Sequence, residues 1–195
     1  TLLEYGDRIP AEDRDELLHS VQEEARRLHS YVQNLLDMTR IGSPDFQLKR
    51  DWVDLADLVE SARKRLDSSW RQHKLLVHFD QHVPQLYVHG ALIEQVLVNI
   101  LDNASRYSPE GAEIRVWCGR LEGRPALRVE NTGARVSGDA LPHLFEAFYR
   151  EEGSRNRSTG GSGLGLYLVK MILDRHGAVC TIENTEEGVK ATVRF

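Results

Sequence analysis

The sequence has few cysteines, no long apolar stretch and no excess of positive charge, and each absence excludes a class of protein. Cys118 and Cys180 each stand alone in a strand-like run rather than at the short spacing of a metal or redox motif. We expect both to be buried apolar thiols without chemistry. No stretch is long enough to cross a bilayer. A net charge of −5 gives no electrostatic footprint for DNA or RNA, so we expect no nucleic-acid partner.

Glycine is concentrated in residues 160–165, directly before an apolar-periodic run that ends at His176. A loop without side chains lets backbone N–H groups approach an anion, and the start of a helix adds unpaired donors. The segment lacks the Gly-Lys-Ser/Thr ending of a P-loop, and its glycine spacing does not fit the dinucleotide fingerprint. By itself it fits either a phosphate site or a plain hinge.

A second group of polar residues lies on a helix that we expect over residues 92–107. The spacing puts Asn99, Asn103 and Arg106 on one stripe of this helix. The amide oxygen of Asn103 suits Mg²⁺, which prefers oxygen ligands and shares its shell with phosphates and water. The alternative is an ordinary amide on a helix surface.

The first part of the chain is expected to form one long helix over residues 11–41, between Pro10 and a stop at residues 42–44. Its apolar residues alternate spacings of three and four, which is typical of a coiled-coil seam. They are Leu18, Val21, Ala25, Leu28, Val32 and Leu35. One helix cannot bury such a seam, so it either packs on the following domain or joins a bundle with a second chain, and the regular spacing favours the bundle. Residues 1–9 fit the tail of a preceding antiparallel helix.

The rest of the chain alternates helical and strand-like patterns. We expect helices over residues 55–73, 92–107 and from the glycines to 176, and strands at 52–53, 75–79, 113–118, 126–130, 179–183 and 189–195, with turns around Gly119, Gly123 and Glu187-Gly188. The fold class is an α/β (α+β) two-layer sandwich, with a mixed sheet and helices on one face. The long polar segment between Gly133 and Gly163 indicates a mobile lid.

Taken together, these motifs resemble the ATP-binding domain shared by sensor histidine kinases, gyrase, Hsp90 and MutL. Residues 99–103 are similar to the N box of that family, 144–150 to the F box and 161–165 to the second glycine box; the F box favours histidine kinases. The resemblance implies a Bergerat-type ATP-binding domain over residues 44–195. Residues 1–43 would then be part of the dimerisation and histidine-phosphotransfer bundle.

The two halves of the chain resemble different branches of these kinases. Residues 34–40 and 46–52 look like the KdpD potassium-responsive sensors. Residues 129–195 look more like the VanS-type kinases of vancomycin-resistance systems. This difference suggests a chimera.

The resemblance implies a site for ATP and Mg²⁺. Asn99 and Asn103 would be its catalytic residues, and Asn103 would hold the metal. The residues expected to contact ATP are Asn103, Arg106, Tyr107, Asn131, Gly133, Gly161, Gly163, Leu164 and Gly165. Phe145, Phe148 and Tyr149 would anchor the lid, with a generic role as core aromatics as the alternative.

The adenine loop departs from the family pattern at two positions. Asn131 stands where an aspartate is expected, but it can still present its carbonyl oxygen to the adenine amino group, without charge assistance. Arg135 stands where a glycine is expected, and arginine adopts a positive φ less readily, which puts the close backbone approach in doubt. We expect ATP binding to be weaker but intact.

None of the eight histidines has the family's phosphoacceptor context, a histidine followed by Glu or Asp and then Pro. His19 and His29 lie on the expected bundle helix, where a solvated or interfacial role is favoured. The resemblance therefore implies a histidine protein kinase fragment that transfers the γ-phosphoryl group of ATP to a histidine outside this chain, for relay to a response-regulator aspartate.

The implied setting is a homodimer formed through the bundle, in the cytoplasmic portion of a bacterial sensor whose membrane contact lies in a region outside this chain. Two other functions remain open. A GHKL-type ATPase would need a catalytic carboxylate near the N box, which Asp102 or Glu94 would have to supply. A dimerisation and interaction module would not respond to nucleotide.

Overall fold

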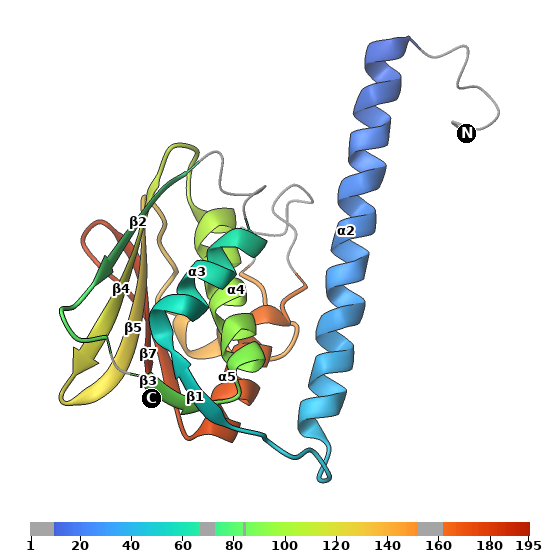
Figure 1. The fold of residues 1–195 in the computed structure, drawn as a ribbon. Coiled ribbons are helices and arrows are strands. Elements are labelled where there is room, and N and C mark those ends of the chain that lie inside the picture. The colour runs from blue at the N-terminus through green and yellow to red at the C-terminus, as the bar shows by residue number, and fades with distance from the viewer. Residues whose placement is uncertain (1–9, 67–72, 84, 152–161) are drawn as a thin grey trace.

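The computed structural model describes residues 10–66, 73–83, 85–151 and 162–195. It contains one long helix beside a two-layer α/β domain (Figure 1). The helices are α2 (Ala11–Gly42), α3 (Leu55–Arg65), α4 (Gly90–Tyr107) and α5 (Gly165–His176), with a short 3-10 turn η3 (Leu141–His143). The strands are β1 (Asp51–Asp54), β2 (Lys74–Phe79), β3 (Gln85–Val88), β4 (Glu113–Leu121), β5 (Arg124–Thr132), β6 (Val179–Asn184) and β7 (Gly188–Arg194).

Five of the strands form one mixed sheet in the order β2-β4-β5-β7-β6. β2 pairs with β4 in parallel, and the other pairs are antiparallel. Because successive side chains of a strand point to opposite faces, Ile114, Val116 and Cys118 of β4 all lie on the buried face. β1 and β3 form a separate antiparallel ribbon. The mixed sheet expected from the sequence is confirmed.

Helices α3, α4 and α5 cover one face of this sheet (Figure 1). α4 and α5 pack against each other, and both supply residues to the core, where Ile93, Leu97 and Leu101 of α4 and Leu168 and Ile172 of α5 are buried. Burying each such side chain contributes roughly 1.5–3 kcal/mol. The layer of helices is therefore held firmly against the sheet, and the ends of α4 and α5 are fixed in space.

Helix α2 leaves the domain as a single rod and meets it near its C-terminal end (Figure 1). Ile41 is buried in the core, and Met38 packs against it. The seam residues Leu18, Val21, Leu28, Val32 and Leu35 are exposed instead. The sequence left two possible partners for this seam, the following domain or a second chain. The described residues of the following domain do not cover it. Residues 1–9, expected to be the tail of a preceding helix, lie outside the described residues.

Several boundaries differ from the sequence expectation. α3 ends at Arg65, where Leu66 caps it, rather than near residue 73. β3 was not expected, because its four residues are too short a run for periodicity to stand out. Gly119 lies inside β4, and the turn is made by Glu122 and Gly123, both with positive φ.

The two cysteines lie in β4 and β6, as expected. Cys118 is fully buried and Cys180 partly buried. Burial raises the pKa of both thiols to about 12, so neither is a reactive thiolate at neutral pH. Among the described helices, none is both long and apolar enough to cross a membrane.

Candidate functional site

The C-terminal half of α4 carries the predicted asparagine stripe, and it faces the start of α5. A Cβ atom built on Gly165 would lie 3.7 Å from Asn99 Oδ1, so the first residue of α5 rests on the Asn99 side chain. Gln95 Nε2 donates to Asn99 Oδ1 at 3.5 Å. Asn99 Nδ2 is buried and has no hydrogen-bond partner within the described part of the chain. The asparagine helix and the glycine loop, distant in sequence, therefore meet around a polar atom that still needs a partner.

The glycine loop and the F box are fastened to each other by their backbones. Phe148 N donates to Gly163 O at 3.0 Å. Gly163 has φ of +70°, and a Cβ atom there would lie 2.7 Å from the carbonyl carbon of Phe148. Both the positive φ and the close approach require glycine at this position. The F box is thus held beside the start of α5.

The first turn of α5 is open to a ligand's acceptor groups. Leu164 precedes the helix and is buried, and its N–H donates to Ser162 Oγ. No side-chain hydrogen bond among the described residues caps this end. The early N–H groups of a helix lack intrahelical acceptors and favour an anion. Gly161, the other glycine expected to contact ATP, lies outside the described residues.

Asn131, at the end of β5, is only 6% exposed and has a fixed orientation. Its Nδ2 donates to Ser108 Oγ at 2.8 Å, and the Ser108 hydroxyl donates in turn to the Ala104 carbonyl. Because Ser108 engages the donor end of the amide, Oδ1 remains as an acceptor. This is the atom that the sequence analysis expected Asn131 to offer.

The loop after Asn131 contains one glycine that its backbone requires and an arginine without a positive φ. Gly133 has φ of +79°, and a Cβ atom there would lie 2.7 Å from Pro109 Cγ. The described non-glycine residues with positive φ are Glu122 and Phe148, so Arg135 has an ordinary backbone conformation. Arg135 therefore needs no positive φ in this structure, and the effect of this departure on nucleotide binding stays a prediction. Asn184 holds the next residue through two hydrogen bonds with the backbone of Val136.

The other predicted residues of α4 line the same end of the helix. Asn103 is half-buried, one turn after Asn99, and Tyr107 is 43% exposed. Arg106 Nη2 forms an ion pair with Asp102 Oδ2 at 2.8 Å. A partly exposed pair of this kind contributes about 1 kcal/mol or less, so a phosphate group can compete for the guanidinium.

The aromatic residues of the F box have different environments. Phe145 packs against the core, which fits both a lid anchor and a generic core aromatic. Tyr149 stacks on His143 with ring centroids 5.5 Å apart. Phe148 is 68% exposed and does not anchor the segment through burial; its backbone N–H, rather than its ring, holds the segment to Gly163. Residues 152–161, the rest of the expected lid, lie outside the described residues.

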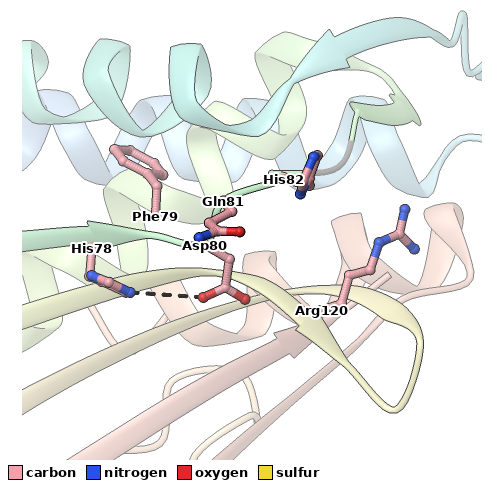
Figure 2. A pocket seen from close by; sticks show the side chains of 6 residues that line it. All are labelled: His78, Phe79, Asp80, Gln81, His82 and Arg120. Carbon is pink, nitrogen blue, oxygen red and sulfur yellow. Dashed lines mark ion pairs between the residues drawn. The ribbon is translucent and has the colours of Figure 1, made fainter.

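A separate hollow of about 480 Å³ lies at the end of β2, beside the β4–β5 hairpin. In Figure 2, His78 and Asp80 point toward each other, 3.8 Å apart, and Arg120 lies on the other side of Asp80. Trp117 Nε1 also donates to Asp80. None of the predicted site residues lines this hollow, so it is distinct from the site formed by α4, β5 and α5.

Comparison with known proteins identifies the family. A model described as histidine kinase-, DNA gyrase B- and HSP90-like ATPase matches residues 89–195, more than half of the chain. The chain belongs to this family. The match includes every described residue of the candidate site, from Asn99 to Gly165.

Relatives of known sequence are bacterial sensor kinases. The chain is 31% identical over 188 residues to the sensor protein KdpD of Clostridium acetobutylicum, covering 96% of this chain and 21% of KdpD. It is 30% identical over 192 residues to the sensor histidine kinase YkoH of Bacillus subtilis, covering 98% of this chain and 41% of YkoH. The chain thus spans less than half of either relative. The KdpD likeness extends through both halves of the chain; the suggested chimera stays a prediction.

Solved structures share the fold. The Acinetobacter baumannii histidine kinase AdeS superposes with a TM-score of 0.74 at 22% identity, covering 96% of this chain and 85% of AdeS. Full-length ShkA, solved in complex with AMPPNP, gives a TM-score of 0.75 at 21% identity, covering 95% of this chain and 39% of ShkA. The resemblance to sensor histidine kinases and the Bergerat-type fold are confirmed.

Sequence reasoning missed the residues that support the site. Ser108 orients Asn131, Pro109 packs over Gly133 and Asn184 holds the following loop. Nothing in the spacing of Ser108 and Pro109, which follow α4, indicates contact with β5. Asn184 gives no local signal, since its partner lies 48 residues away.

Proposed function

We propose that this chain is the ATP-binding catalytic region of a bacterial sensor histidine kinase. Residues 44–195 form the ATP-binding domain, and residues 1–43 are part of the dimerisation bundle. The observation that carries the proposal is the meeting of Asn99 with Gly165, which joins the asparagine helix to the glycine loop in a member of this ATPase family. The γ-phosphoryl group passes to a histidine outside this chain and then to a response-regulator aspartate.

Asn103 is proposed to hold the metal, and Asn99 to be a catalytic residue beside it. The unpartnered, buried Nδ2 of Asn99 supports a polar ligand here, because burial without a hydrogen bond is costly. Asn103 holds Mg²⁺ through its amide oxygen, and the ion neutralises charge on the phosphates. Phosphoryl transfer of this kind needs positioning and charge neutralisation rather than a nucleophile from this chain.

The remaining predicted residues are proposed to hold the nucleotide. Asn131 accepts a hydrogen bond from the adenine amino group through Oδ1, beside the backbone of Gly133. The open first turn of α5, from Gly163 through Leu164 to Gly165, receives phosphate oxygens. Arg106 and Tyr107 complete the contacts from α4, and Gly161 is assigned the same role from the family pattern alone.

The exposed seam of α2 supports a homodimer. A stripe containing Leu28, Val32 and Leu35 needs a partner helix, and a second copy of this chain supplies one through a bundle. The response regulator is the proposed downstream partner; the structure of the related kinase ThkA was solved in complex with the response regulator TrrA. The region is proposed to lie in the cytoplasm, tethered by a sensor outside this chain.

Ion pairs in α4 disfavour the ATPase alternative. Glu94 pairs with Arg65 of α3 at 3.1 Å and is not poised to activate water, and Asp102 becomes available for that role only if Arg106 leaves their 2.8 Å ion pair. The interaction module remains as the second candidate, because Asn131 and Arg135 depart from the adenine-loop pattern.

Calorimetry with a non-hydrolysable ATP analogue tests the proposal, with and without Mg²⁺. We expect Mg²⁺ to strengthen binding, and Asn103→Ala to remove most of this metal-dependent gain while the fold persists. Gln81→Ala is the matched control, an exposed amide from the hollow in Figure 2. Unchanged metal-dependent affinity in Asn103→Ala would remove Asn103 as the ligand. No binding by the unaltered chain would favour the interaction module.

A further inference from the structure

The C-terminal ends of α2 and α5 meet at an arginine. Arg175 Nη2 donates to Ile41 O at 2.8 Å and to Ser43 O at 3.2 Å. The last carbonyls of a helix lack intrahelical donors and form the negative end of its dipole. The Arg175 guanidinium, from the last turn of α5, thus caps the end of α2 with a positive charge.

A second set of hydrogen bonds ties the neighbouring backbone to the same corner. Arg50, in the linker after α2, donates through Nη2 to Arg175 O at 3.0 Å. His176 Nδ1 lies 2.7 Å from Ile172 O, and its Nε2 accepts from His89 N at 3.0 Å. A neutral imidazole with its proton on Nδ1 makes both bonds. Since His89 directly precedes α4, the corner joins α2, the linker, α4 and α5.

The opposite ends of α4 and α5 carry the candidate site. α5 begins at Gly165 and has 12 residues, so it is about 18 Å long. Arg175 therefore lies a full helix length from the glycine loop. A change in Arg175 can alter how α2 is held without touching the residues proposed to bind nucleotide.

The two kinds of contact at this corner differ in burial. Ile41 is fully buried, whereas Arg175 is exposed and can exchange its carbonyl partners for water. Breaking the arginine contacts would leave the buried contact of Ile41 in place. α2 would then be free to rotate about this contact while both parts stay folded.

We propose that Arg175 is a positioning residue that latches the bundle helix α2 at a fixed orientation to the ATP-binding domain. The purpose that we assign to this latch depends on the proposed function. A domain that delivers a phosphoryl group to a histidine on a bundle must hold that bundle in a set geometry, and must release it to move. The latch itself rests on the Arg175 contacts alone.

Distance measurements between two spin labels test the latch in the full chain. One label replaces Gln22 on α2 and the other Glu186 in the β6–β7 turn, as Gln22→Cys and Glu186→Cys; both positions are exposed. The raised pKa of the native thiols makes them label slowly. An excess of unlabelled chain limits the signal to distances within one molecule.

We expect a narrow distance distribution for the labelled chain and a clearly broader or shifted one for Arg175→Ala. Arg124→Ala, an exposed arginine at the start of β5, is the matched control and should leave the distribution unchanged. If Arg175→Ala fails to fold, Arg175→Gln replaces it with the same expectation. A distribution in Arg175→Ala equal to that of the parent chain overturns the proposal.

Binding of the ATP analogue and Mg²⁺ separates the two proposals. Arg175→Ala should bind it with the parent affinity, since the latch is remote from the site, and a loss of binding in this variant would contradict a positioning role. A parent chain that does not bind the analogue at all defeats the proposed function, while the distance measurement still decides on the latch.

Discussion

Helices α2 and α4 both carry an apolar face, but only the apolar face of α4 is covered by other parts of this chain. α4 buries Ile93, Leu97 and Leu101 in the core of the domain. The apolar seam of α2 faces solvent over most of its length, and the helix is anchored near Ile41. A helix with an apolar stripe needs something to cover it. The difference indicates that α4 finds its packing partners within this chain, whereas the apolar seam of α2 needs a further partner.

The largest expected effect comes from truncating one leucine in each helix. Leu101→Ala in α4 removes a side chain that is 1% exposed and should lower the free energy of unfolding by about 2–5 kcal/mol. Leu28→Ala in α2, where the leucine is 55% exposed, should change it by about 0.5 kcal/mol or less in the monomer. Denaturant unfolding at low protein concentration measures both. Equal losses would contradict the difference between the helices.

Self-association of the chain tests whether the exposed seam of α2 is covered by a second copy. Leu28→Lys combined with Val32→Lys places two charges on the seam and should weaken dimerisation at least about tenfold, or about 1.4 kcal/mol. Gln22→Lys combined with Ser30→Lys adds the same charge at exposed polar positions of α2 and serves as the control. Sedimentation equilibrium reports the dissociation constants. If the parent chain and both variants associate alike, the seam is not the dimer interface.

The adenine loop provides a comparison within the site. Asn131→Ala removes the proposed acceptor and leaves Ser108 without its partner, so affinity for the ATP analogue should fall by about 1 kcal/mol, roughly fivefold. Arg135→Gly should change affinity by much less, because Arg135 already has an ordinary backbone conformation. Calorimetry of both variants checks this. Tighter binding by Arg135→Gly than by the parent chain would show that the loop does need glycine.

The smallest effect concerns pH at the corner between the helices. Burial is the main cause that lowers the pKa of His176, and the nearby charges of Arg50 and His89 lower it further. The folded state holds a proton on His176 less readily than the unfolded chain does. The neutral histidine therefore imposes no penalty above pH 6.5, and stability falls as pH drops below that value.

Thermal melts across this pH range, on the chain and on His176→Gln, measure that contribution. The parent chain should lose more stability on acidification than the variant does. His19→Gln, at an exposed position of α2, controls for general histidine titration. If the parent chain and His176→Gln lose the same stability on acidification, His176 does not cause the pH dependence.

Long periodic segments were predictable from the sequence, and short or non-local features were not. α2, α4 and α5 follow from repeated apolar spacing over many turns, and Gly177 with φ of +71° ends α5 where expected. β3 has four residues, too few for a pattern. The early end of α3 at Arg65 has no proline or glycine beside it as a signal.

The candidate site also combines residues that a local sequence pattern reveals with residues that only non-local contacts bring together. Asn99, Asn103 and Gly165 were predictable, because the asparagines share a helix stripe and the glycines share a loop. The sequence gives no indication that Ser108 would fix the amide of Asn131. Arg175 was equally hidden, since its partners are backbone carbonyls more than 130 residues away, and a carbonyl has no residue-type signature.

Amide chemical-shift mapping with the Mg²⁺-bound ATP analogue tests the central claim most directly. We predict that the shifts concentrate in the C-terminal half of α4, in residues 131–133 and in residues 163–165, where the site brings three segments together. The hollow at His78, Asp80 and Arg120 should stay unchanged (Figure 2). Shifts confined to that hollow, or none at all, would contradict the assignment of a nucleotide site between α4 and α5.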